Sequence, residues 1–202
     1  MLNPLLEAIG FIVGILFNVY AIVVALRFVM QLVRADYYNP FSQAVVKLTD
    51  PLLKPLRRVV PAIGRYDTAS LVLMFGVLLA KLIIFKFLPL GAAPAISGMY
   101  RLDMVGLPLM LPLALLDMIN QFFNVFIFAL IIRAILSWFP QAGGNPVQHL
   151  ATSISEPVLK PLRNRIPPVG GLDISLFLTV IGLYALRWVV VGTLAVAFGI
   201  GV

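Results

Sequence analysis

The chain contains no cysteine and only one histidine, His149, among its 202 residues. The missing cysteine excludes disulfides, zinc–thiolate sites, thiolate-bound iron–sulfur clusters and a cysteine nucleophile. A single histidine excludes heme ligation by two histidines of one chain, and the Walker, GxSxG, HExxH and CxxC motifs are also missing. We therefore expect a non-enzymatic protein with no catalytic residue, cofactor or metal site, in which His149 is solvated in a loop.

Charged residues are scarce as well. They make up 11% of the chain, hydrophobic residues make up 61%, and the mean hydropathy is +1.04. Soluble domains are about 25% charged, so a water-soluble globule of this composition would have too little polar surface to cover its core. Composition excludes an ordinary soluble enzyme and a disordered chain, and it indicates a membrane protein. The net charge of +7 is then expected on cytoplasmic loops beside anionic lipid, with no nucleic-acid partner.

Four apolar runs are each long enough to span a bilayer, which takes roughly 20 residues. They predict helices at about 8–33, 68–90, 112–139 and 174–200. The expected fold class is an all-α integral membrane protein with four transmembrane helices. Residues 91–111 are rich in proline and glycine. We interpret them as a connecting loop at the membrane surface, with a re-entrant segment as the alternative.

Lysine and arginine are distributed unevenly among the connections between these helices. The first connection has six and the third has three, whereas the second has only Arg101 and the N-terminal tail has none. Because positively charged loops are retained in the cytoplasm, the loops 34–67 and 140–173 are predicted to be cytoplasmic and both termini periplasmic.

A shift of 106 residues superimposes the second half of the chain on the first without a gap. Residues 51–57 fall on 157–163 with six of seven positions identical, and polar residues elsewhere also coincide. This match predicts two repeats, 1–96 and 97–202, each built as helix, amphipathic cytoplasmic segment and helix. An even number of spans returns the chain to its starting side, so the two repeats must be parallel.

Each cytoplasmic segment contains an acid–proline pair followed by basic residues. Asp50-Pro51 and Glu156-Pro157 are predicted to start short helices that lie on the inner leaflet. The basic residues of these segments are candidates for binding anionic lipid or acidic partner loops: Lys54, Arg57, Lys160 and Arg163. Pairing with acidic residues of the chain itself is the competing interpretation.

Several charged residues fall inside the predicted spans. Lys81 and Arg187 lie past the midplane from the cytoplasmic side, where a charge must pair, reach the headgroups or serve a transport function. Both an ion relay and extension to the outer headgroups remain open for them. Asp117 begins a polar stripe with Asn120, Gln121 and Asn124 on one helix face, which would line an aqueous path or form interhelical hydrogen bonds.

Two further features concern contacts between helices. Arg27 and Arg133 lie near the cytoplasmic ends of their spans, at the depth where Asp67 and Asp173 begin the next ones. We predict structural ion pairs Arg27–Asp67 and Arg133–Asp173, or the crossed version between repeats. The glycines of Gly10-x-x-x-Gly14 mark either a close helix contact or a dimer face, so a homo-oligomer remains open.

The segment from Arg133 to Ser175, RAILSWFPQAGGNPVQHLATSISEPVLKPLRNRIPPVGGLDIS, resembles the YggT family of small membrane proteins, and the first repeat has a diverged copy. The resemblance implies a multi-pass protein of the bacterial cytoplasmic membrane, with relatives in chloroplasts. It also implies links to osmotic-shock tolerance, to cell division or chromosome organisation, and to heme attachment during cytochrome b6 assembly. We therefore expect an assembly or organising factor that contacts anionic lipid and other membrane proteins. A small channel or transporter for an ion or osmolyte is the alternative.

Overall fold

The computed structural model describes residues 4–64, 66–88, 90, 93–95, 98–100, 106–138, 145–165 and 174–200. Four long helices dominate it: α1 (Pro4–Leu32), α3 (Thr68–Phe87), α4 (Met110–Ser137) and α6 (Ile174–Ala197). A 3₁₀ turn, η2 (Leu107–Leu109), leads into α4. All four helices are long and apolar enough to cross a membrane, so the four predicted spans are confirmed as candidate spans. The first begins at Pro4, before the predicted position, with Glu7 in its positively polarised first turn.

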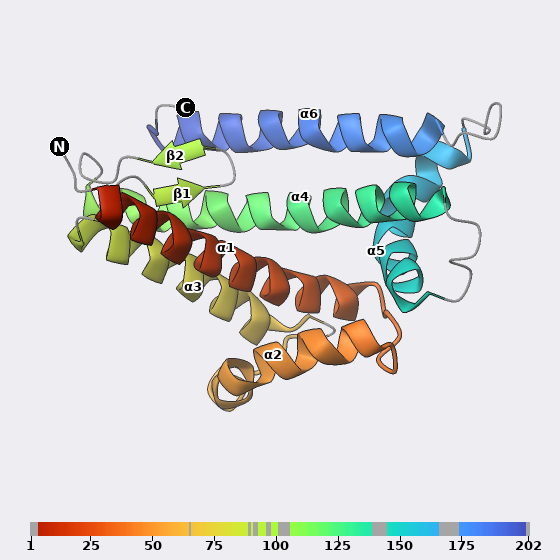
Figure 1. The fold of residues 1–202 in the computed structure, drawn as a ribbon, viewed down its shortest axis with the longest axis horizontal. Coiled ribbons are helices and arrows are strands. Elements are labelled where there is room, and N and C mark those ends of the chain that lie inside the picture. The colour runs from red at the N-terminus through yellow and green to blue at the C-terminus, as the bar shows by residue number, and fades with distance from the viewer. Residues whose placement is uncertain are drawn as a thin grey trace.

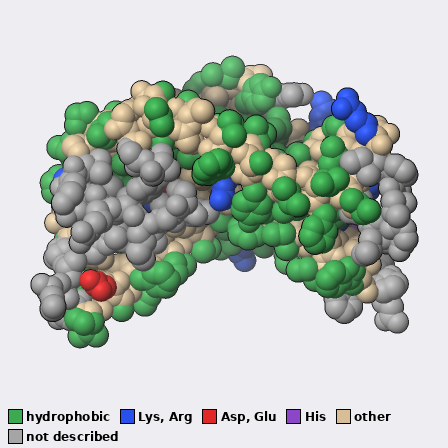
Figure 2. All heavy atoms as spheres, turned by 90° about the horizontal axis from the view of Figure 1, so that it is seen from above, with side chains coloured by type: hydrophobic (Ala, Val, Ile, Leu, Met, Phe, Trp, Pro, Cys, Tyr) green, Lys and Arg blue, Asp and Glu red, His purple; other side chains and the backbone are tan. Residues whose placement is uncertain are grey.

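The spans run back and forth between two ends of the molecule. In Figure 1, α1 and α4 lead away from the end where the N- and C-termini lie, and α3 and α6 return to it. Helices α1, α3 and α4 pack against one another, whereas α6 packs chiefly on α4 and on α5 (Pro146–Arg163). Hydrophobic side chains are spread over the described part of the face in Figure 2, and a group of Lys and Arg side chains lies at the right-hand end, where α5 is found.

Small residues allow α1 to pack closely within the bundle. Its buried positions include Gly10, Gly14, Ala21 and Ala25. A Cβ added at Gly10 would overlap the backbone carbonyl of Leu90, so this glycine is required by a contact inside the chain. Of the two interpretations of the glycine motif, close contact within the protein is therefore the one that the structure accounts for.

Helices α2 (Pro40–Leu56) and α5 follow α1 and α4, and both begin at an Asn-Pro pair. The side chains of Asn39 and Asn145 accept hydrogen bonds from backbone amides two residues later, each at 2.9 Å. The prediction that these helices start at Pro51 and Pro157 is wrong. Both begin eleven residues earlier, at Pro40 and Pro146, because asparagine caps and a proline at the first helical position start them there.

Two smaller differences from the sequence predictions remain. His149 is exposed as expected, but it lies in α5 and not in a loop. The predicted loop 91–111 contains an antiparallel hairpin of β1 (Ala93–Ala95) and β2 (Gly98–Tyr100), and β1 lies against α1 and α3. The rest of that segment, up to residue 105, lies outside the described residues.

Candidate functional site

A lysine–aspartate pair lies buried between two spans. Lys81 on α3 and Asp117 on α4 have side chains that are 0% and 3% exposed, and Lys81 Nζ lies 2.7 Å from Asp117 Oδ2. The same Nζ donates a hydrogen bond to Asn18 Oδ1 on α1 at 3.0 Å. Lys81 therefore joins three helices and does not extend to the headgroups. Opposite charges at this separation neutralise each other in an apolar surrounding.

The predicted polar stripe on α4 faces the interior of the bundle. Asp117, Asn120, Gln121 and Asn124 are all buried, as their spacing on one helix face predicts. Several of their polar atoms have no hydrogen-bond partner among the described residues: Asp117 Oδ1, both amide atoms of Asn120, Gln121 Oε1 and Asn124 Nδ2. Buried groups of this kind retain the capacity to bind water or a polar ligand.

Arg187 on α6 occupies the position in the second repeat that Lys81 occupies in the first. Its Nη1 donates to Asn124 Oδ1 at 3.2 Å, which repeats the contact from Lys81 to Asn18. The guanidinium also lies 5.0 Å from the ring centroid of Tyr184, a cation–π contact. The two halves thus share one interhelical contact, with the charge kept and the lysine exchanged for arginine.

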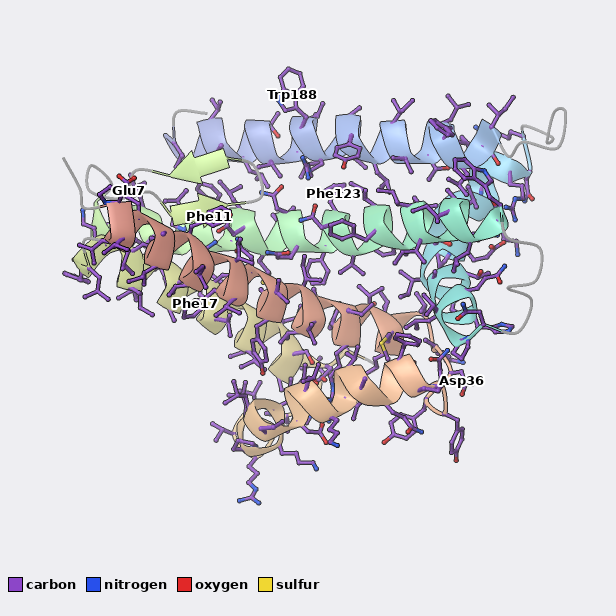
Figure 3. All side chains as sticks on the ribbon, in the orientation of Figure 1. Glu7, Phe11, Phe17, Asp36, Phe123 and Trp188 are labelled. Carbon is purple, nitrogen blue, oxygen red and sulfur yellow. The ribbon has the colours of Figure 1, made fainter. Side chains whose placement is uncertain are left out.

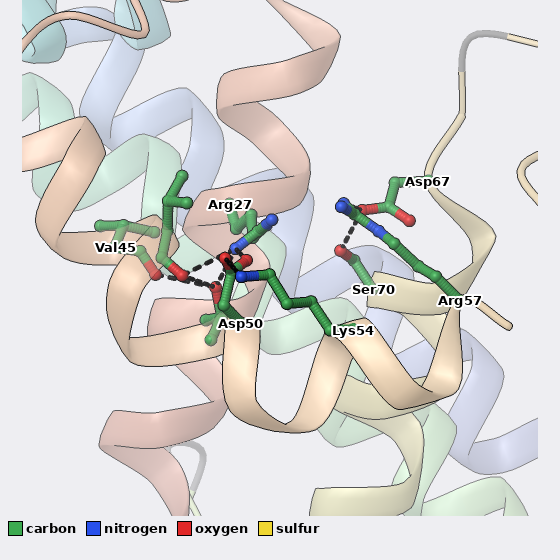
Figure 4. A network of polar contacts seen from close by, with 9 residues as sticks. Arg27, Val45, Asp50, Lys54, Arg57, Asp67 and Ser70 are labelled. Carbon is green, nitrogen blue, oxygen red and sulfur yellow. Dashed lines mark hydrogen bonds and ion pairs between the residues drawn. The ribbon is translucent and has the colours of Figure 1, made fainter.

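A second polar cluster joins helix α2 to the spans (Figure 4). Arg27 Nη1 donates to Thr49 Oγ1 at 2.6 Å, to Asp50 Oδ1 at 2.7 Å and to the carbonyl of Val46 at 2.9 Å. Asp50 also binds Lys54, with Nζ and Oδ2 3.0 Å apart. The cluster fixes the angle between α1 and α2.

Arg133 makes the equivalent contacts in the second repeat. Its Nη1 lies 3.1 Å from Ser155 Oγ and 2.7 Å from Glu156 Oε2. Asp67 is held by Arg57 and accepts a hydrogen bond from Ser70 Oγ at 2.7 Å. The predicted pair Arg27–Asp67 is therefore wrong: α2 begins at Pro40 and places Asp50 beside Arg27. Asp173, the predicted partner of Arg133, lies outside the described residues.

These contacts lower the pKa of two carboxyl groups in the loop segment. Burial acts to raise the pKa of Asp67, but the hydrogen bonds from Arg57 and Ser70 outweigh it and hold the pKa below its usual value. Asp50 behaves in the same way: burial raises its pKa, and the hydrogen bonds from Lys54 and Arg27 lower it by more. Both carboxylates are therefore ionised at neutral pH.

The four basic residues proposed for lipid or partner binding have different surroundings. Lys54 and Arg57 form ion pairs with Asp50 and Asp67, as the competing interpretation expects. Lys160 is exposed in the last turn of α5, and Arg163 ends that helix half-buried. Internal pairing therefore accounts for the first repeat, and Lys160 of the second repeat is exposed.

An apolar cavity of about 370 Å³ lies where the two repeats meet, between the spans α1 and α4 and the helices α2 and α5. Most of its lining consists of residue pairs related by the shift of 106 residues: Ile22 and Phe128, Leu26 and Ile132, Phe41 and Val147, Ala44 and Leu150, Val45 and Ala151, Leu48 and Ile154. The cavity therefore lies on the approximate symmetry axis of the duplication. In the described part of the chain, no group of three or more His, Cys, Asp or Glu side chains could hold a metal ion.

Sequence reasoning missed several residues of these clusters. Asn18, Thr49 and Ser155 are not among the predicted site residues, although each binds one of the predicted charged residues. Asn18 and Asn124 coincide under the repeat shift, and Thr49 and Ser155 do so with both hydroxyls kept. Coincidence of polar residues under the shift is the signal that would have found them.

The four long helices are apolar enough to cross a membrane, and together they indicate a multi-pass membrane protein. A model of the CCB3/YggT family matches residues 6–88 and 112–194, and the chain therefore belongs to this family, with one copy in each half. An uncharacterized protein of Pseudomonas aeruginosa is 37% identical over 94% of this chain and 91% of its own length.

Two other relatives illustrate the range of the family. The uncharacterized protein YggT of Escherichia coli K12 is 32% identical over 90% of this chain and 88% of its own length. The protein named YlmG homolog protein 2, chloroplastic, of Arabidopsis thaliana is 40% identical over 32% of this chain and 26% of its own length. No solved structure is significantly similar to the chain.

Proposed function

We propose that the chain is a non-enzymatic protein of the bacterial cytoplasmic membrane that acts as an assembly or organising factor for other membrane proteins. The observation that carries this proposal is the apolar cavity between the repeats. A path for an ion or osmolyte needs polar groups along its wall. The side chains that line this cavity are apolar instead, and they suit apolar segments of other proteins. The roles implied by the family resemblance, from osmotic tolerance to cytochrome assembly, are all compatible with such a factor.

The proposed orientation places both termini in the periplasm and helices α2 and α5 at the inner leaflet, with the repeats parallel. The common direction of α1 and α4 in Figure 1 supports it, as does the excess of Lys and Arg in the loops that contain α2 and α5. In this orientation Lys160 and Arg163 face the anionic leaflet, where each basic residue contributes about 1 kcal/mol of attraction.

A small channel or transporter is the second candidate, and one observation favours it. The unpartnered polar atoms of Asp117, Asn120 and Gln121 lie inside the bundle, where they would suit a hydrated path. The apolar cavity between the repeats argues against a wide hydrated path, but it does not conflict with a narrow path along the polar atoms of α4.

Two measurements separate the candidates. Purified protein in liposomes is assayed for release of cations, anions and glycerol, and cells depleted of the protein are assayed for the abundance of membrane complexes on native gels. An assembly factor gives no release above protein-free liposomes, and its depletion lowers particular complexes that the wild-type gene restores. Release above that of protein-free liposomes, with complexes unchanged after depletion, would establish the transporter instead.

A further inference from the structure

Arg187 differs from its repeat counterpart in one respect: no carboxylate neutralises it within the described part of the chain. Lys81 is paired with Asp117, but the residue that corresponds to Asp117 in the first repeat is Phe11. Arg187 has only the amide oxygen of Asn124 and the ring of Tyr184. It lies roughly 20 Å along α6 from Ile174 and about 15 Å from the other end. A charge at this depth is expensive unless it is paired.

Among the described residues, none gives a second copy of this chain a free carboxylate at this depth. Asp117 is the one acidic residue in the interior of the four spans, and it already binds Lys81. Glu7 lies in the first turn of α1, at the end of the bundle where Figure 3 labels it. Asp50, Asp67 and Glu156 belong to the polar contacts of the opposite end. Asp36 lies in the turn before α2, and Asp103 and Asp173 lie outside the described residues. The described residues therefore supply no free carboxylate at the depth of Arg187, which favours a counter-charge from a different molecule.

The repeat geometry indicates where that molecule lies. Helices α1 and α4 both pack on α3, α4 brings Asp117 to Lys81, and the α3 residues Leu78 and Leu82 are fully buried. The equivalent residues on α6 are Tyr184 and Trp188, which are 45% and 79% exposed. Figure 3 shows Trp188 projecting away from the bundle. The corresponding residues of α3 are covered by other helices. On α6 this face is exposed, and Arg187 lies beside it.

We propose that this face of α6 docks a transmembrane helix of another membrane protein that carries Asp or Glu near the middle of the bilayer, and that Arg187 forms the ion pair with it. The docked helix takes the place on α6 that α4 takes on α3, and its carboxylate takes the role of Asp117. The inference rests on the proposed function as an assembly factor and names the chemistry of its partner. Tyr184 and Trp188 supply the apolar contact area, since large aromatic side chains dominate interface energies.

The test uses leucine-rich transmembrane peptides that differ only at the central residue, which is Glu, Gln or Leu. The protein has no cysteine, so a single Val196→Cys substitution near the exposed end of α6 takes a fluorophore, and association in nanodiscs is measured by energy transfer to labelled peptide. We expect the Glu peptide to bind about tenfold more tightly than the Leu peptide, equivalent to 1.4 kcal/mol. The Gln peptide should fall between them.

Three variants test whether the preference for the Glu peptide depends on the charge of Arg187. Arg187→Gln keeps a donor for Asn124 but removes the charge, and it should lose the preference for the Glu peptide. Arg187→Lys should keep most of it, and Lys86→Gln, which removes a charge elsewhere in the spans, should leave it unchanged. Thermal unfolding of each variant in the same nanodiscs checks that it is folded.

Equal binding of the Glu and Leu peptides to the wild type overturns the inference, as does a preference that persists in Arg187→Gln. The first result would leave a lipid phosphate as the counter-charge of Arg187. The peptide assay contains no cellular complex, so a negative result there contradicts the docked helix and not the assembly function shown by depletion. A negative depletion experiment likewise contradicts the assembly function and not the measured preference for the Glu peptide.

Discussion

Lys81 and Asp117 are charged residues that an apolar bundle retains because each neutralises the other. Neither side chain reaches water, so the two charges depend on their mutual contact and on the amide oxygen of Asn18. Removal of one partner leaves a buried charge uncompensated, whereas replacement of both by apolar side chains of similar volume removes the problem altogether. A single substitution at either residue should therefore cost more stability than the intact pair contributes on balance.

The first prediction is that single and double substitutions at this pair are strongly non-additive. Lys81→Met or Asp117→Leu should each lower the free energy of unfolding by about 3–5 kcal/mol, and the double variant should lose much less. Denaturant titration in detergent micelles, followed by circular dichroism, measures all three, with Lys86→Met as the control for a charge in the same helix. Additive losses would show that the two residues do not act as a pair.

The second prediction concerns pH at the first turn of α3. The pKa of Asp67 is lowered in the folded protein, so the stabilisation from its ion pair with Arg57 is complete above the unfolded pKa, about 3.9. It is lost as the pH falls through the lower, folded pKa. Hydrogen exchange of the α3 first-turn amides, corrected for intrinsic rates, should accelerate on acidification below about pH 4.

Asp67→Asn is the control for this experiment. Its first-turn amides should exchange faster than those of the wild type at neutral pH, and acidification should change them little. If the variant keeps the pH dependence of the wild type, another group is responsible, and Asp50, whose pKa is also lowered, is the first to examine.

At the level of elements, the third prediction uses two glycines with opposite surroundings. A methyl group at Gly10 would overlap the carbonyl of Leu90, whereas a methyl group at Gly76 on α3 would meet no atom within 4 Å. Gly10→Ala should therefore displace the segment after α3 and lower the free energy of unfolding by about 1–3 kcal/mol. Gly76→Ala should be neutral or slightly stabilising, because alanine is the better helix former. Comparable losses in both variants would contradict the close contact at Gly10.

The sequence predicts the spans much better than the helices between them. Twenty apolar residues have few alternatives to a spanning helix, and the four runs are found as helices. The starts of α2 and α5 were misplaced because both Asn-Pro and an acid–proline pair are N-terminal helix signals. The structure uses Asn39 and Asn145, and the helices continue through the later prolines. The partner of Arg27 was misassigned for the same reason, since the position of Asp50 depends on where α2 begins.

For the whole molecule, the duplication predicts contacts as well as elements. The pairs Lys81–Asn18 and Arg187–Asn124 coincide under the repeat shift, and so do the contacts of Arg27 and Arg133 in the loops. The sequence alone does not show that α4 packs on α3 while no further helix of the described residues packs on α6 in the same way, because apolar residues suit lipid and protein equally well. That asymmetry depends on tertiary packing, and it is the reason why Arg187 is left without a carboxylate in the described chain.

The last prediction is the orientation of the whole molecule in the membrane. His149 on α5 and Leu107 before α4 are both exposed and lie at opposite ends of the spans, so each suits a single reporter cysteine. In intact cells an impermeant maleimide should label Leu107→Cys and leave His149→Cys unlabelled until the membrane is permeabilised, because the basic loops are retained inside. Wild-type protein, which has no cysteine, is the blank. Labelling of His149→Cys in intact cells would reverse the orientation and place the basic helices α2 and α5 at the outer surface, where the anionic inner leaflet could not attract them.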